Sequence, residues 1–509
     1  EAGEMLGEDD LARAEKELEG RFDEDNAGFG FNRKFPVPHE MQFLLRRYAK
    51  NGNAADLKMV EATLRAWRMG GIFDHVGLGI HRYSTDAAWL VPHFEKMLYD
   101  QALCSLAYVD AWRVTKDATF ERAAREILTY VARDMTAPGG GFYSAEDADS
   151  EGEEGLFYLW TVAEVEEVLG KQDAAWVIEN LRMTEEGNYR DEATGQRTGR
   201  NILHLSSLLT DSGREKWEPL RTKLFDSREA RIHPLKDDKV LTDWNGLMIT
   251  AFAEAGRAFG DVGLIGQAER AAGFLRANLL TEDARLMKRS RGGEAGLQGM
   301  VEDYAFTIQG LLSLFEASHK PADLELARRL TDSALEYFWD EENGGFFLSP
   351  DDGEKLVVRS KEAYDGARPS GNSVMATQML RLARMTGEMS YEARAIETVK
   401  AFSPAVASRP SSHTQLLAAV DFVEAKSREI VIVGDPESPE VGKMPRRYAP
   451  NDVVLLKVPG PRGDALALVA PYTAVQSAPE GGVAAYVCEG FACKAPVATA
   501  EALEELLKP

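Results

Sequence analysis

The sequence predicts a mainly α-helical protein: a closed ring of helical hairpins, an (α/α)6 toroid, followed by a small C-terminal α/β module. Three observations predict this fold class: six helix starts that share one pattern, amphipathic helices between them, and a Gly–aromatic turn that recurs after helical segments. With 509 residues the chain is too long for one ordinary compact core. It fits either one large closed architecture or several domains.

The six helix starts have polar residues, often beside a proline, just before an apolar helical run. Proline near the first turn, with Ser, Asp or Thr beside it, is typical of helix N-termini. The runs are apolar on nearly all sides, as buried helices are. We therefore expect inner helices that start near residues 38, 92, 243, 302, 370 and 411.

Between these runs lie helices with a single apolar face. In residues 119–135, apolar side chains recur at i, i+3, i+4 and i+7, with Arg and Glu on the other face. Residues 57–69, 266–280 and 322–339 follow the same plan. Buried helices that alternate with half-exposed ones indicate the two layers of a double ring. An open helical superhelix is the structural alternative.

A short turn recurs where helical segments end, with polar residues, then glycines, then an aromatic. It occurs at residues 21–31, 133–143 and 337–347, and in a shorter form at 67–73. Glycine just past a helix end is the usual left-handed cap. Irregularly spaced repeats of a helix–turn–helix plan indicate an array or a closed ring.

The domain boundaries follow from where this pattern stops. Residues 1–427 are the predicted toroid, interrupted by an insertion at about 139–210. The insertion opens with a predicted β-hairpin, which we expect to cover one rim as a lid, and Thr161 with Glu164 then forms a capping-box signature. After residue 427, three short β-branched runs and a final helix predict an α/β module over 428–509.

Composition excludes several classes of protein. Lys+Arg 59 against Asp+Glu 83 gives a net charge of −24, which favours solubility and opposes binding to a phosphate backbone. No apolar run approaches the roughly 20 residues that span a bilayer, and no signal peptide is visible. Three cysteines are too few for a disulfide scaffold and fit a reducing compartment. We expect a cytoplasmic protein with no nucleic-acid or membrane partner.

In the predicted ring, the polar first turns of the inner helices converge on one funnel. Helix N-termini present unpaired N–H groups and favour anions or carboxylates. Taken singly, each polar residue is explained equally well as a cap of its own helix. Convergence of all six is harder to explain as core, because burying so many polar groups is costly. The residues expected to bind a substrate are Arg33, Lys34, His39, Asp74, Arg82, Glu95, Lys96, Trp244, Asn245, Tyr304, Asp365, Ser370 and Asn372.

Candidate acids and bases lie in the same first turns and the loops before them. Histidine is the usual general acid or base near neutral pH. Asp243, paired with a carboxylate that starts the next inner helix, offers the two carboxyls that glycoside chemistry needs roughly 5–10 Å apart. The candidate catalytic residues are His75, His81, His93, Asp243, Glu302 and Asp303.

The sequence patterns do not favour a metal site. The spacing H-x5-H-x11-H from His75 to His93 matches no standard zinc pattern, and histidines bonded inside a polar loop are the plainer reading. The acidic tip 147–155 begins like a calcium loop, but Tyr158 stands where a bidentate Glu is needed. We expect no metal and no cofactor.

Cys488 and Cys493 flank a Gly–Phe turn near the C-terminus. Two interpretations stay open. They are either a disulfide or redox pair, although C-x4-C is not the usual redox motif, or two small residues that pack at a strand end.

Several blocks resemble one known family. The run from Gly70 to Tyr108 resembles the spermatogenesis-associated-protein-20-like family, and further blocks follow in the same order over nearly the whole chain. These are residues 142–161, 239–249, 301–306, 364–374 and 486–493. Members carry an N-terminal thioredoxin-like domain, whereas this chain has no C-x-x-C pair. The helical part of the family is similar to six-hairpin glycosidases and N-acylglucosamine 2-epimerases.

Two functions are expected from the funnel and the resemblance together. The first is a carbohydrate-active enzyme, either a sugar epimerase or isomerase or a glycoside hydrolase, that takes a small-molecule ligand in the funnel. The alternative is a non-catalytic binding or scaffold module partnered in cis with a thioredoxin-like domain. Polar residues that converge in an open pocket favour the enzyme, and a plugged funnel favours the scaffold.

Overall fold

The computed structural model describes residues 3–191, 194–355, 357–444 and 447–508. Six inner helices form a closed ring, because each contacts the next and the last contacts the first. Their side chains are buried on almost every side, as their apolar sequences require. The predicted α/α toroid is therefore confirmed. The inner helices are α2 (Pro38–Asn51), α4 (Leu98–Thr115), α9 (Thr242–Phe259), α11 (Val301–Ser318), α13 (Gly371–Thr386) and α15 (Thr414–Glu424).

A second layer of helices surrounds this ring. Each outer helix buries one face against an inner helix and turns its charged face outward. The expected alternation of inner and outer helices is present along the whole ring. The outer helices are α1 (Glu8–Arg21), α3 (Ala54–Met69), α5 (Ala118–Asp134), α10 (Val262–Asn278), α12 (Pro321–Phe338) and α14 (Ser390–Ser408).

One inner helix starts later than the sequence predicts. We expected a start near residue 92, but α4 begins at Leu98. The preceding residues form two short strands, β2 (Pro92–His93) and β3 (Lys96–Met97), which pair with β1 (Tyr83–Ser84) and β4 (Ala145–Glu146). Backbone groups committed to these ladders cannot also make the first turn of a helix.

A two-residue bridge follows five of the outer helices, and three of these bridges lie in the predicted Gly–aromatic turns at 21–31, 133–143 and 337–347. Asn side chains of inner helices hold two of these turns in the same way. Asn245 bonds both backbone groups of Phe142, and Asn372 bonds both backbone groups of Phe346. The bridges are Phe22 with Phe29, Phe73 with Ile80, Thr136 with Phe142, Leu280 with Leu286 and Trp339 with Phe346.

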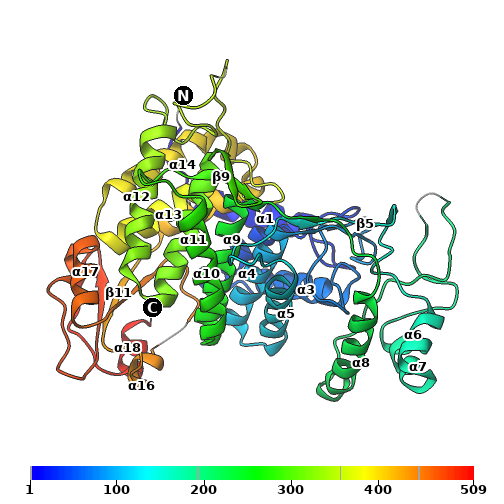
Figure 1. Cartoon of the computed structure of the whole chain (residues 1–509). Helices are drawn as coiled ribbons and strands as arrows, with labels where there is room; N and C mark the ends of the chain where they lie inside the picture. The colour runs from blue at the N-terminus through cyan, green and yellow to red at the C-terminus, as the bar shows by residue number, and fades with distance from the viewer. Residues whose placement is uncertain (1–2, 192–193, 356, 445–446, 509) are drawn as a thin grey trace.

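The insertion forms a lobe at one side of the ring (Figure 1). It has a core of its own around Trp160 and Trp217, and the Thr161–Glu164 capping box forms as expected. The acidic hairpin also forms, as β5 pairs with β6. The lobe and its connections contain β5 (Asp149–Ser150), β6 (Glu153–Glu154), α6 (Val162–Leu169), α7 (Lys171–Asn180), α8 (Asp211–Glu229) and β7 (Lys236–Asp237). β8 (Val240–Leu241), β9 (Met287–Arg291) and β10 (Glu294–Gln298) make a small sheet near the start of α9.

The C-terminal module contains a four-stranded sheet in the order β12-β11-β13-β14, with β11 and β12 parallel and the other pairs antiparallel. It packs on the ring through contacts of β12 with α11 and α13, and of α17 with α12. In Figure 1 it lies on the side away from the insertion. The elements are β11 (Glu429–Val433), α16 (Pro439–Gly442), β12 (Val453–Lys457), α17 (Pro461–Val469), β13 (Ala484–Glu489), β14 (Ala492–Cys493) and α18 (Ala500–Leu506), with 3-10 turns at Pro410–Ser412 and Pro471–Thr473.

Within the residues that the structure describes, none of the helices is long and apolar enough to cross a membrane.

Candidate active site

Two acidic first turns of the ring meet at one lysine. Asp243 lies in the first turn of α9 and Asp303 in the first turn of α11. The Nζ atom of Lys288, on β9, is 3.0 Å from Asp243 Oδ2 and 3.1 Å from Asp303 Oδ1. Arg368, which precedes α13, places its Nη1 3.2 Å from the same Asp243 oxygen. Four side chains from segments far apart in the sequence therefore meet at one rim.

Asp303 is the structural member of this group. Its carboxylate is fully buried and accepts hydrogen bonds from the backbone N–H groups of Met300 and Asp243. Burial, and then the neighbouring Asp243 carboxylate, raises the pKa of Asp303, while Lys288 opposes that shift. Because its oxygens are taken by these donors, Asp303 positions the starts of α9 and α11.

Glu302 is the accessible carboxyl of this rim. It is half-buried beside the start of α13, where a Cβ on Gly371 would lie 3.3 Å from Glu302 Cγ. Burial raises the pKa of Glu302, and the Arg368 and Lys288 charges oppose that shift. Of the two predicted partners for Asp243, Glu302 is the one that solvent can reach.

A second group of polar side chains surrounds His93. His93 Nδ1 lies 2.6 Å from Glu154 Oε1 of the insertion hairpin, and Nε2 lies 3.6 Å from Glu95 Oε2. The hydrogen bond to Glu154 raises the pKa of His93, against the effect of partial burial. The ring stacks on Tyr83 at 5.1 Å, and the Arg33 guanidinium lies 5.2 Å from the same Tyr83 ring. The acidic hairpin thus contacts the rim at His93.

Tyr99 and Arg82 connect the two groups. Tyr99, in the first turn of α4, meets Trp244 of α9 edge to face at 4.9 Å. Burial raises the pKa of Tyr99, and the Arg82 charge opposes it. Arg82 Nη1 in turn lies 3.1 Å from Glu95 Oε2. The His93 group and the Asp243 group therefore share one rim, which we call the N-terminal rim.

The predicted histidines 75 and 81 lie buried behind this rim. His75 Nε2 is 2.9 Å from the Gly70 carbonyl, and His81 Nδ1 is 2.9 Å from the Phe94 carbonyl. Burial lowers the pKa of each to about 3. Both are therefore neutral groups committed to the backbone, and this geometry does not favour a catalytic role for either.

Asp74 and Lys96, expected in the funnel, also lie in this buried region. Asp74 accepts two hydrogen bonds from Arg228 of α8, at 2.9 and 2.7 Å, and one from Lys96 at 2.7 Å. The cluster fastens the insertion to the loop before α4. Arg228 is 154 residues from Asp74, so no local pattern could have paired them.

Several other predicted binding residues serve the fold. Buried Lys34 bonds Asp23 and the carbonyls of Ala27 and Ala87. Tyr304 is also buried, and its hydroxyl accepts the Leu286 N–H.

Buried polar side chains also hold the start of α13 in place. Ser370 caps this helix by accepting the Ser373 N–H. Asp365 accepts the N–H groups of Ser370, Gln415 and Leu416, and burial raises its pKa to about 7. Together with Asn245 and Asn372 described above, these residues hold turns and helix starts in place.

His39 lies deeper, on an internal cavity of about 170 Å³ along the axis of the ring. Burial lowers the pKa of His39 to about 4, opposed by the backbone of Asp365. Charged side chains from the C-terminal halves of inner helices form part of the cavity wall, and β11 and α18 of the module line another part. We call these charges the axial ion-pair ring: Asp110, Arg113, Glu254, Arg257, Glu316 and Arg381.

Sequence reasoning missed three features of the site. Lys288 lies on β9, and no pattern in the sequence predicts that this strand faces the rim. Asp100, in the first turn of α4, is buried with one carboxylate oxygen unpartnered among the described residues, and burial raises its pKa well above the ordinary range. The axial ion-pair ring had a usable signal, since charges such as Glu254 and Glu316 interrupt otherwise apolar runs.

Comparison with known proteins decides the family. No family model matches the chain. The human protein named spermatogenesis-associated protein 20 is 36% identical, over 98% of this chain and 69% of its own length. This chain belongs to the spermatogenesis-associated protein 20 family. An uncharacterized protein of Caenorhabditis elegans is 29% identical over 95% of this chain and 71% of its own length.

Among solved structures, the chain is similar to a crystal structure of D-mannose isomerase. The TM-score is 0.51 at 10% identity, over 78% of this chain and 85% of that chain. Likeness at this identity shows the fold, an α/α toroid. In this member of the spermatogenesis-associated protein 20 family, the blocks that carried the sequence resemblance contain His93, Asp243, Glu302 and Arg368, and also both C-terminal cysteines.

Proposed function

We propose that this chain is a sugar isomerase or epimerase whose active site lies at the N-terminal rim. One observation carries the proposal: Glu302, an accessible carboxyl with a raised pKa, lies within electrostatic reach of Lys288 and Arg368, the two cations that pair with the nearby Asp243. A carboxylate whose pKa is raised is a stronger base, and nearby cations stabilise the oxyanion that a proton abstraction creates.

The chemistry follows from these three groups. Glu302 takes the proton from the carbon beside the sugar carbonyl, and the electron pair moves onto the carbonyl oxygen to give an enediolate. Lys288 and Arg368 stabilise that charge. Return of the proton to the neighbouring carbon gives the isomer when the hydroxyl proton of the first carbon also passes to the former carbonyl oxygen. Return of a proton to the other face of the first carbon, with the electron pair restored to the carbonyl, gives the epimer. His93, whose pKa is raised by Glu154, is the second acid–base group at this rim.

Asp243 and Asp303 act as positioning residues in this proposal. Asp243 binds both cations, and only 3% of its side chain is exposed. Glycoside hydrolysis needs two available carboxyls. With Asp243 and Asp303 both engaged, Glu302 stands without a free partner, which favours proton transfer over hydrolysis. Arg82, Glu95 and Trp244 are the proposed contacts to the sugar.

The second candidate is a non-catalytic binding or scaffold module that works with a thioredoxin-like domain. Its support is that several polar groups in helix first turns and in the loops before them are fully used within the fold. Asp303, Asn245, Asn372 and Asp365 each bond backbone groups. A rim built mainly for capping would bind without reacting.

Isotope exchange separates these candidates. The chain is incubated in D2O with D-mannose, D-fructose, D-glucose and N-acetyl-D-mannosamine, and proton NMR follows loss of the hydrogen beside the carbonyl. We expect exchange on at least one of these sugars, and a fall of roughly 100-fold or more in Glu302→Gln. The matched control is Glu294→Gln, exposed on β10, with unchanged exchange.

The other outcomes decide against the enzyme. Sugars that raise the melting temperature without any exchange would support the binding module. Exchange that survives in Glu302→Gln would remove this residue from the mechanism.

A further inference from the structure

We propose that the Cys488–Cys493 disulfide is a thiol–disulfide exchange site, which accepts electrons from a dithiol that attacks Cys493. The structure joins these cysteines, which resolves one of the two interpretations left open by the sequence. The proposal concerns the C-terminal module and is independent of any activity at the N-terminal rim.

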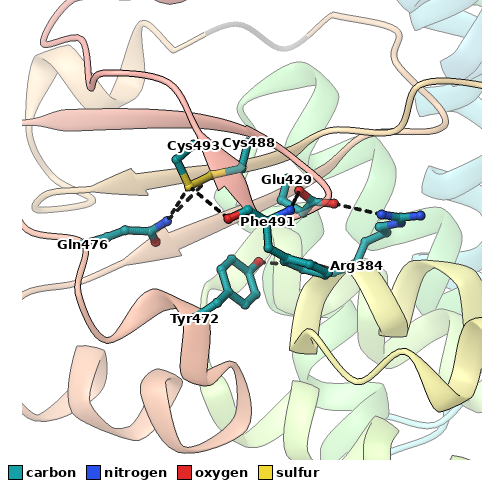
Figure 2. The surroundings of a disulfide bond; sticks show 7 residues. All are labelled: Arg384, Glu429, Tyr472, Gln476, Cys488, Phe491 and Cys493. Carbon is teal, nitrogen blue, oxygen red and sulfur yellow. Dashed lines mark hydrogen bonds and ion pairs between the residues drawn. A yellow bond between two sulfur atoms is a disulfide. The ribbon is translucent and has the colours of Figure 1, made fainter.

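The disulfide adds little to the global stability of the chain. Cys488 and Cys493 lie directly opposite each other where β13 pairs with β14 (Figure 2). Gly490 and Phe491 at the turn have φ of 55° and 66°, the left-handed pair that suits a two-residue hairpin. A cross-link stabilises a chain least when it closes a short loop, and these residues are only five apart. A purely structural role therefore explains the bond poorly.

The two sulfurs differ in access. Cys493 is an exposed residue, whereas Cys488 is fully buried. Exchange requires a thiolate to approach one sulfur while the other leaves. Cys493, the more exposed residue of the pair, is thus the one attacked, and Cys488 is the leaving group.

Gln476 is placed to serve both redox states. Its Nε2 lies 3.8 Å from Cys488 Sγ and 3.5 Å from Cys493 Sγ. Figure 2 shows the Gln476 side chain directed at the disulfide. The side chain is buried, and its Oε1 has no hydrogen-bond partner among the described residues. The amide N–H stabilises the leaving thiolate. After the amide rotates, the carbonyl oxygen accepts a bond from a thiol, so reduction satisfies an acceptor that the disulfide leaves unpaired.

The electrons balance as follows. One thiolate of the dithiol attacks Cys493 Sγ, a mixed disulfide forms, and the Cys488 thiolate leaves. The second thiol of the dithiol then attacks its own partner sulfur and releases Cys493. Two electrons pass to the protein, the dithiol becomes a disulfide, and its two protons end on Cys488 and Cys493.

The hairpin tip lies on the seam between the module and the ring. The Phe491 N–H donates to Glu429 Oε2 at 3.0 Å, and Arg384 of α13 lies 3.3 Å from Glu429 Oε1. The Phe491 ring packs on Tyr472 at 5.0 Å, and the Tyr472 hydroxyl donates to the Arg384 carbonyl (Figure 2). Release of the disulfide therefore loosens a contact that joins β11 to α13.

The first test measures exchange in the native chain. The protein is equilibrated in buffers of reduced and oxidised dithiothreitol, quenched in acid, alkylated and read by peptide mass spectrometry. We expect Cys488 and Cys493 to be reduced without denaturant while buried Cys104 stays unmodified. If the pair is modified only under conditions in which Cys104 is also modified, reduction requires unfolding and the proposal fails.

The second test examines direction and the role of Gln476. With glutathione, a monothiol, we expect the mixed disulfide on Cys493 and the alkyl label on Cys488; the reverse labelling would overturn the assignment. Gln476→Leu should slow reduction by dithiothreitol about tenfold, whereas Gln172→Leu, exposed on α7, should not. An unchanged rate in Gln476→Leu would contradict the role given to the amide.

Hydrogen exchange supplies a readout of the seam. Reduction should speed amide exchange at Phe491 and along β11, with no change in α5 on the far part of the ring. Equal protection in both redox states would contradict the coupling of the disulfide to the contact between β11 and α13.

Discussion

Charged side chains are exposed and paired differently at the two ends of the inner helices. At the N-terminal rim, Glu302 and His93 are partly exposed and have pKa values raised by their surroundings. At the other end, the axial ion-pair ring pairs its charges with each other inside the toroid. Glu316, for example, lies 3.0 Å from Arg257 and 2.6 Å from Arg381.

This difference separates two uses of the same helices. A buried charge that loses its partner is costly, so a chain of ion pairs from α4 to α13 serves the stability of the ring. A partly exposed acid beside cations costs less and stays available to a ligand. The comparison teaches that polar residues on inner helices do not by themselves indicate a site, and that unequal pairing does.

Removal of one member of the axial ion-pair ring should give the largest effect. Glu316→Ala leaves both Arg257 and Arg381 short of a partner inside the toroid. We expect the free energy of unfolding, from urea titration, to fall by about 3–5 kcal/mol. The control is Glu325→Ala, which breaks an exposed pair with Arg328 and should cost under about 1 kcal/mol. Similar losses of unfolding free energy in both variants would contradict the view that the axial ion pairs stabilise the toroid more than an exposed pair does.

A pH titration should show the next effect. The folded pKa of His39 is about 4, below its ordinary value of 6.5, so the unfolded chain binds the proton more tightly. The contribution of the neutral His39 to the free energy of unfolding is fully present above pH 6.5. It is lost as the pH falls from 6.5 to 4, by about 3 kcal/mol in all. The buried His75 and His81 add to the same trend.

His39→Gln isolates this residue. The urea midpoint of the variant should fall less steeply between pH 6.5 and 4 than that of the parent chain. His233→Gln, at an exposed position, is the matched control and should leave the profile unchanged. A parallel profile in His39→Gln would mean that this imidazole is hydrated in the folded state.

The smallest change in stability is expected at the rim. Glu302→Gln removes a partly buried charge whose pKa is raised, so the free energy of unfolding should stay within roughly 0.5 kcal/mol of the parent value. Urea titration at pH 7 provides the measurement. A loss comparable to that of Glu316→Ala would assign Glu302 to the scaffold instead of the site.

The ring was predictable because its signals are local. The residues that cap an apolar helix lie within a few positions of its start. The starts at 38, 242, 301, 371 and 414 lie close to those expected. The start of α4 was missed because tertiary pairing of β2 and β3 overrides the helical pattern of the same residues.

The candidate site was predictable only in part. Helix starts place Asp243 and Glu302 on one rim, but no pattern states that Lys288 bridges from a hairpin. His75 and His81 have the polarity of a functional loop, and their burial depends on Arg228 and on backbone carbonyls distant in sequence. The spacing of Cys488 and Cys493 allows a hairpin bond or none, and strand pairing decides between them.

Closure of the ring has a consequence for synthesis of the chain. Arg13 of α1 bonds the Ala407 carbonyl, and the Ser411 N–H donates to Glu17, each across 394 residues. The first helices therefore leave the ribosome long before their final neighbours exist. Until α15 emerges, apolar surface on α1 and α2 stays uncovered, and such surface is where nascent chains aggregate or bind chaperones. Contacts this distant in sequence also form slowly. The apolar surface of the first inner helix is therefore covered only after the last inner helix has been synthesised.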